Sequence, residues 1–137
     1  MRIDHRALRS AVLAGLALFA LHLAALSPAA RAHAARISAR EFNSGVSLFK
    51  RGEFTLAADV FKQLLEKYPD AEQIDEVKYW YAETQDRMND GAKALEFYKK
   101  IIVDHPQSKF LTRALFGAGY SAYRLNQFQE ASGYFIE

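Results

Sequence analysis

The chain has 137 residues, half of them hydrophobic, and a formal net charge of +2 at pH 7. This length suits one small domain with a packed core, and the composition argues against intrinsic disorder. The absence of cysteine excludes disulfides, thiolate metal sites, a cysteine nucleophile and lipid attachment through an N-terminal cysteine. Beyond residue 34 the basic and acidic side chains nearly balance, so no basic stripe predicts nucleic-acid binding.

Residues 1–34 are expected to form a secretory signal peptide. A segment rich in arginine precedes the apolar run Ala11–Leu26, and Ala32 and Ala34 have the small-x-small spacing of a cleavage site. A helix as long as this run spans about 24 Å, less than the roughly 30 Å of a bilayer's hydrocarbon core. We therefore expect a periplasmic protein, cleaved after Ala34, with no stable membrane span. The alternative is an uncleaved signal that anchors the chain in the inner membrane.

After a short linker at 35–37, the sequence predicts six helices in three pairs. The first helix of each pair is expected at about 39–50, 71–88 and 108–124, and the second at about 54–67, 91–104 and 128–137. The second helices carry apolar residues three and four positions apart, as in the run from Phe54 through Ala57 and Phe61 to Leu64. This spacing places the apolar residues on one face of a helix.

Cap residues predict where the first helices begin. Ser38 and Glu41 have the spacing of a capping box, in which each side chain hydrogen-bonds the backbone of the other residue. Asp70 and Ser108 precede the later first helices, and both are residue types that favour the N-cap.

The three pairs are in register at a step of 37 residues. The equivalent positions are Gly45, Ala82 and Gly119 in the first helices, Ala57, Ala94 and Ala131 and then Phe61, Tyr98 and Phe135 in the second, and Gly52, Asn89 and Asn126 between them. Gly and Asn tolerate the left-handed conformation that ends a helix. The small residues let the two helices approach, and the aromatic residue opposite fills the remaining gap. Because no pair buries its apolar face alone, the pairs must stack.

This pattern resembles the tetratricopeptide repeat, which has a small residue in its first helix, Ala and then an aromatic residue in its second, and a closing Pro. Pro69 and Pro106 stand at the closing position. The longer period resembles envelope members of the family, such as the Tol–Pal periplasmic coordinator and the tetratricopeptide subunit of the outer-membrane barrel-assembly machine. The resemblance implies an all-α, right-handed solenoid with repeats at about 38–70, 71–107 and 108–137.

No arrangement of residues in the sequence predicts catalysis. His105 is the only histidine beyond residue 34, and one histidine without cysteine cannot assemble a typical zinc site. The pairs Glu83 with Asp86 and Asp75 with Glu76 stand among Lys and Arg, and we interpret them as a solvated helix face. We therefore expect no enzyme, no metal and no cofactor.

The resemblance implies that the first helices line a concave groove for a segment of a protein partner. The family's inner positions correspond to Phe42, Phe49, Lys50, Tyr79, Glu83, Arg87, Arg113, Phe116, Tyr120, Tyr123 and Arg124, with Val46 and Asp86 beside them. Aromatic and Arg side chains are the types that dominate binding energy at interfaces. The Asn of a carboxylate clamp is missing, because Val46, Glu83 and Tyr120 stand at its positions. The expected function is a non-catalytic interaction scaffold of the bacterial envelope.

The sequence leaves several alternatives open. The aromatic residues could instead belong to the core, or they could stack on sugar rings and bind peptidoglycan or another glycan. No polar helix covers the last apolar face, which solenoids normally need. We expect either that further repeats or an active domain follow Glu137, or that a partner or a second copy of the chain covers this end.

Overall fold

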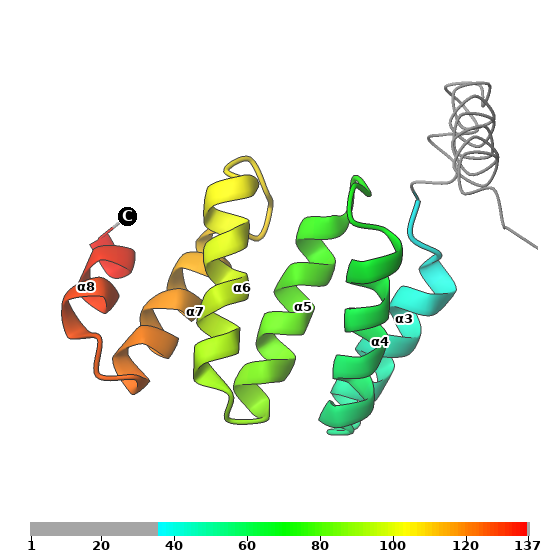
Figure 1. Cartoon of the computed structure of the whole chain (residues 1–137), viewed down its shortest axis with the longest axis horizontal. Coiled ribbons are helices and arrows are strands. Elements are labelled where there is room, and N and C mark those ends of the chain that lie inside the picture. The colour runs from blue at the N-terminus through cyan, green and yellow to red at the C-terminus, as the bar shows by residue number, and fades with distance from the viewer. Residues whose placement is uncertain (1–35, 137) are drawn as a thin grey trace, which may run out of the picture. The chain divides into compact units, whose positions relative to one another are not determined.

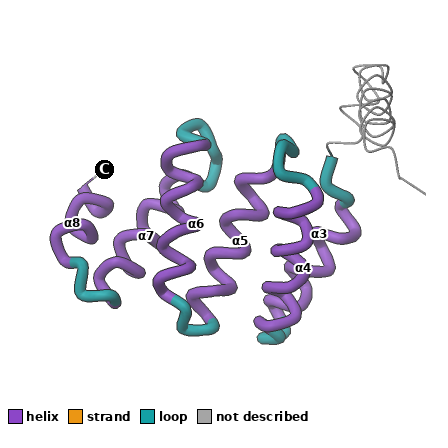
Figure 2. Tube along the Cα trace, in the orientation of Figure 1, coloured by secondary structure: helices purple, strands orange, loops and turns teal. Residues whose placement is uncertain are grey.

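A computed structural model describes residues 36–136 of the chain (Figure 1). This part is entirely helical apart from its turns, and its helices are α3 (Ala39–Lys50), α4 (Phe54–Lys67), α5 (Ile74–Arg87), α6 (Gly91–Asp104), α7 (Leu111–Arg124) and α8 (Phe128–Ile136). Figure 2 shows short loops joining each helix to the next. The predicted all-α architecture of helix pairs is confirmed, whereas the predicted signal peptide at 1–34 lies outside the described residues.

The predicted bounds agree for α3, α4 and α6, but α5 and α7 begin three residues later than predicted. The residues in front of these two helices form hydrogen-bonded turns. The N–H of Ile74 donates to the carbonyl of Ala71 at 3.0 Å, and the N–H of Leu111 donates to that of Ser108 at 3.1 Å. The connection between two pairs therefore contains a turn of its own, and this turn shortens the first helix of the following pair.

The predicted N-cap at Ser38 is confirmed, but the hydrogen bonds of the predicted capping box do not form. Ser38 is the N-cap of α3, but its side chain makes no capping hydrogen bond. Glu41 instead accepts a hydrogen bond from Lys67 Nζ at 2.9 Å, which ties α3 to the end of α4. Asp70 and Ser108 are not N-caps, because the turns place those caps at the residues directly before α5 and α7.

The predicted helix ends at Gly52, Asn89 and Asn126 are confirmed. Their φ angles are 79°, 65° and 62°, in the left-handed region that Gly and Asn tolerate. After each of them, the next backbone N–H donates to a carbonyl five residues earlier. This is the Schellman arrangement, and it reverses the chain between the two helices of a pair.

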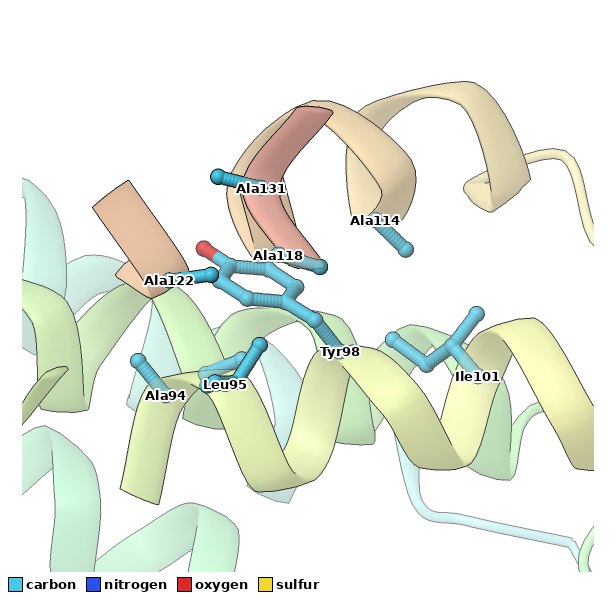
Figure 3. Packing of buried hydrophobic residues seen from close by; sticks show 9 residues of the cluster. Ala94, Leu95, Tyr98, Ile101, Ala114, Ala118, Ala122 and Ala131 are labelled. Atoms are coloured by element: carbon cyan, nitrogen blue, oxygen red, sulfur yellow. The ribbon is translucent and has the colours of Figure 1, made fainter. Parts of the chain in front are cut away.

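The core combines large rings with small residues. Phe61 lies on Gly45 of its own pair, as the sequence analysis predicts, and a Cβ on Gly45 would lie 2.7 Å from the ring. Tyr98 of α6 is also buried, but it contacts the following helix pair as well. A Cβ on Gly117 of α7 would lie 2.5 Å from the Tyr98 ring. Figure 3 shows this ring beside Ala118 and Ala122 of α7. The aromatic residue therefore joins neighbouring pairs in addition to filling the gap within one.

The first helices form the inner face of the array. In the described part of the chain, the backbone of α3 lies close to that of α5, and α5 lies close to α7, whereas the backbones of α4 and α6 and those of α6 and α8 stay apart. The link between α6 and α8 is made by long side chains, because Lys99 Nζ pairs with Glu130 Oε1 at 2.8 Å. Because the first helices approach one another while the second helices diverge, the array curves with α3, α5 and α7 inside.

Candidate functional site

A hollow of about 370 Å³ opens on the inner face between α5 and α7. Its lining residues are Glu83, Asp86, Arg87, Tyr98, Phe116, Gly117, Tyr120 and Arg124. Five of them are inner positions that the resemblance implies, and Asp86 stands beside those positions. The sequence does not predict Tyr98 and Gly117 as lining residues, because its pattern places Tyr98 in the core and gives no signal for Gly117.

Two exposed aromatic side chains of α7 form one wall of the hollow. Phe116 is 67% exposed and Tyr120 is 48% exposed, and they stand one helical turn apart. Tyr98, which is only 2% exposed, reaches the hollow from the core beneath. Gly117 makes this approach possible, because any side chain at that position would overlap the Tyr98 ring. Among the described residues, Phe116 therefore belongs to the accessible surface.

An ion pair occupies the end of the hollow near the C-terminus of α7. Arg124 Nη1 donates to Asp86 Oδ1 at 2.7 Å, and Nη2 donates to the side-chain oxygen of Asn89. The Arg124 guanidinium also lies 5.8 Å from the centre of the Tyr120 ring. These contacts neutralise Arg124 and Asp86 and fasten α7 to the end of α5.

Glu83 is the second carboxylate of the hollow, and its partner is a hydroxyl. Tyr98 Oη donates to Glu83 Oε1 at 2.6 Å. Burial raises the pKa of Tyr98 well above its usual value, and the Glu83 charge raises it further, so Tyr98 stays protonated and donates. Burial and the same carboxylate raise the pKa of Tyr79 to about 12, while the Arg113 guanidinium opposes the rise. No Lys, Arg or His within residues 36–136 forms a salt bridge with Glu83.

Three predicted groove residues are half-buried and help to pack the helices. Phe42 belongs to the apolar cluster of α3, α4 and α5. Phe49 packs edge-on against Trp80 at a centroid distance of 5.2 Å, and Tyr79 stacks on Phe110 at 4.8 Å. These three side chains are therefore better described as core residues, which is the alternative that the sequence left open, than as the lining of an open groove.

The other predicted residues are exposed but lie outside the hollow. Lys50 is at the end of α3, and the Arg113 guanidinium lies 6.0 Å from the Phe110 ring. Tyr123 is 58% exposed and packs edge-on against Phe128. Of the eleven predicted residues, the structure thus gathers the five on α5 and α7 that line the hollow.

The acidic pairs do not form the freely solvated face that the sequence predicts. Glu83 and Asp86 are engaged as described above, Asp75 accepts from the Ser108 hydroxyl, and Glu76 pairs with Lys109 at 3.2 Å. These half-buried carboxylates hold neighbouring segments together. Within residues 36–136, no group of three His, Cys, Asp or Glu side chains is placed to hold a metal ion.

Comparison with known families identifies the repeat. A family model of the tetratricopeptide repeat matches residues 41–71 and 76–108, which cover the first two helix pairs. These two segments therefore match tetratricopeptide repeats, and arrays of such repeats present a curved face that serves protein–protein interaction. A search of curated proteins finds no match. Among the described helices, none is both long enough and apolar enough to cross a membrane.

Proposed function

We propose that this array of tetratricopeptide repeats is an interaction scaffold of the bacterial envelope that binds a peptide segment of a protein partner on its inner face. The observation that carries the proposal is the hollow between α5 and α7, in which exposed Phe116 and Tyr120 stand beside charged groups. Aromatic rings bury a large area at a low cost in side-chain entropy and dominate many interfaces.

The proposed envelope location rests on residues 1–34. Their basic start, short apolar run and small residues at Ala32 and Ala34 are the features of an exported chain. Cell fractionation followed by N-terminal sequencing tests this. We expect a periplasmic product that begins at Ala35, and recovery of intact Met1 in the membrane fraction would establish an anchor instead.

Site-specific cross-linking in cells tests the location of binding. A photo-reactive phenylalanine analogue replaces Tyr120 in the hollow or, as the control, Val103, which is 74% exposed on α6. We expect cross-links from position 120 to map to one continuous segment of a partner, and none from position 103. Equal capture at both positions would contradict binding on the inner face.

The captured segment, made as a synthetic peptide, then tests the two aromatic residues. Phe116→Ala combined with Tyr120→Ala should weaken its binding to the purified chain by at least about tenfold, since hot-spot truncations cost about 2 kcal/mol or more. Val103→Ala is the control, and circular dichroism checks that the helices remain. A folded double variant with unchanged affinity would refute the proposed site.

Glycan binding is the second candidate. Phe116, Tyr120 and Tyr123 are all exposed and recur four and three residues apart, so they share one side of α7 and could stack on sugar rings. Protein-free peptidoglycan sacculi distinguish the two candidates. If sacculi retain the wild-type chain but not the double variant, the ligand is a glycan and the peptide proposal fails.

A further inference from the structure

We infer that the hollow selects a Lys or Arg side chain of the bound peptide, with Glu83 as the counter-ion and Phe116 as the ring that covers the side chain's stem. This inference rests on the proposed peptide-binding function and adds the chemistry of the bound residue. The carboxylate clamp that the sequence lacks would select the opposite charge.

The first argument is the uncompensated charge of Glu83. A half-buried carboxylate is costly unless hydrogen bonds or a cation stabilise it. Tyr98 supplies one hydrogen bond, to Oε1, while a carboxylate can accept several more. A cationic group from a ligand would supply both the missing charge and further hydrogen bonds, and such charge-assisted bonds are the strong ones.

The second argument is that the neighbouring cations are directed elsewhere. Arg124 is held by Asp86. Arg87 follows Glu83 by one helical turn, a spacing that permits an ion pair, but none forms between them. Its guanidinium instead lies 5.9 Å from the centre of the Phe49 ring. Arg113 acts on the hydroxyl of Tyr79, as Glu83 does, but it forms no salt bridge with Glu83. Among the described residues, no cation is therefore paired with Glu83, and its charge can bind a cation of a ligand.

The third argument is the shape and chemistry of the wall. A ring face attracts cations, and the alkyl stem of Lys or Arg packs along apolar surface while its charged end reaches a polar partner. Tyr120 already has Arg124 over its ring, but Phe116 is 67% exposed. An acidic side chain in the same place would meet the Glu83 carboxylate, which has no salt-bridge partner among the described residues, and be repelled.

Libraries of short synthetic peptides test the inference with the purified full chain. All have blocked ends and random flanking residues, and one central residue is fixed as Lys, Arg, norleucine or Glu. We expect the Lys and Arg libraries to bind at least about tenfold more tightly than the Glu library. Norleucine tests the charge on its own, because it keeps the stem of Lys without the amine, and we expect it to bind more weakly than Lys.

Two variants then assign the preference to Glu83. Glu83→Gln should abolish the preference for Lys over norleucine, and Glu83→Lys should turn it into a preference for Glu. Glu72→Gln is the matched control, because Glu72 is exposed, lies before α5 and forms no salt bridge within the described residues. Circular dichroism melts check the fold of each variant.

The outcomes separate this inference from the function on which it rests. If the wild-type chain binds none of the libraries, peptide binding itself fails, and the inference with it. If it binds peptides but does not prefer Lys to norleucine, only the selection of a basic side chain is overturned. The same holds if folded Glu83→Gln keeps the preference. The comparison of the Lys and norleucine libraries on the wild-type chain tests the inference even if a Glu83 variant does not fold.

Discussion

The first and third helix pairs use the same contact in different surroundings. A Cβ on Gly45 would lie 2.7 Å from the ring of Phe61, and a Cβ on Gly119 would lie 2.6 Å from the ring of Phe135. Phe61, however, is fully buried, whereas Phe135 is 51% exposed. The difference arises because α5 packs on α4, while within the described residues no later helix packs on α8. The same local contact therefore involves a buried ring in one pair and, among the described residues, an exposed ring in the other.

The second pair lies between these cases and differs in chemistry. Its aromatic residue is Tyr98, which is buried like Phe61 but carries a hydroxyl that reaches Glu83. The same position that only fills space in the first pair thus connects the core to the hollow on the inner face.

Gly117→Ala should have the largest effect on stability. The new methyl group would meet three atoms of the Tyr98 ring at 2.5, 2.7 and 2.8 Å, and that ring is enclosed. Overpacking of this kind costs roughly 1–3 kcal/mol of unfolding free energy, and we expect the upper part of that range. Urea denaturation followed by circular dichroism measures it.

Gly133→Ala in α8 is the matched control, because nothing lies within 4 Å of its new methyl group. Replacing an exposed helical Gly by Ala should stabilise the chain by roughly 0.5–1 kcal/mol. Replacing Gly by Ala should thus lower stability at position 117 and raise it at position 133. A loss of similar size in both variants would show that the contact with Tyr98 is not the cause.

Gly45→Ala and Gly119→Ala test the comparison of the two ends directly. Phe61 cannot move without disturbing the core, so Gly45→Ala should cost roughly 1–3 kcal/mol. Phe135 can swing into solvent, so Gly119→Ala should cost less than about 1 kcal/mol, because helix propensity offsets part of the strain. Equal losses in urea denaturation would contradict the distinction between the buried and the exposed ring.

Tyr98→Phe gives the second pair the aromatic residue of the first and should have a smaller effect. It removes the hydrogen bond to Glu83, and water can replace part of that bond because Glu83 is half-exposed. We expect a loss of about 1 kcal/mol in unfolding free energy. A variant as stable as the wild-type chain would indicate that water satisfies Glu83 fully.

The sequence predicts helix ends and equivalent positions well, because Gly52, Asn89 and Asn126 adopt the backbone conformation that their residue types favour. It does not predict which neighbouring helix a side chain contacts. The 37-residue register places Tyr98 opposite a small residue of its own pair but gives no signal for Gly117. The sequence therefore predicts only part of the hollow, because Tyr98 and Gly117 come together through contact between two neighbouring pairs.

The register also relates two links between helices whose charges are reversed. In the first pair, Glu41 accepts from Lys67 Nζ at 2.9 Å. At the equivalent positions of the second pair, Lys78 Nζ lies 3.3 Å from Asp104 and 2.8 Å from His105 Nε2. The geometry of the pair thus places these positions together, while the sign of each charge is free to change.

The smallest predicted effect concerns the first of these links and depends on pH. The hydrogen bond from Lys67 holds the pKa of Glu41 below its usual value of 4.5. A lowered pKa in the folded state means that Glu41 stabilises the fold above the unfolded value, and that this contribution is lost as the pH falls through the folded value. Glu41→Gln should therefore unfold at a slightly lower urea concentration than the wild-type chain at about pH 7, and the two midpoints should converge as the pH falls through the lowered pKa of Glu41. Glu72→Gln, which removes an exposed carboxylate without a salt bridge among the described residues, should show no such convergence. A difference between Glu41→Gln and wild type that persists or grows in acid would mean that the side chain acts through packing and not through its charge.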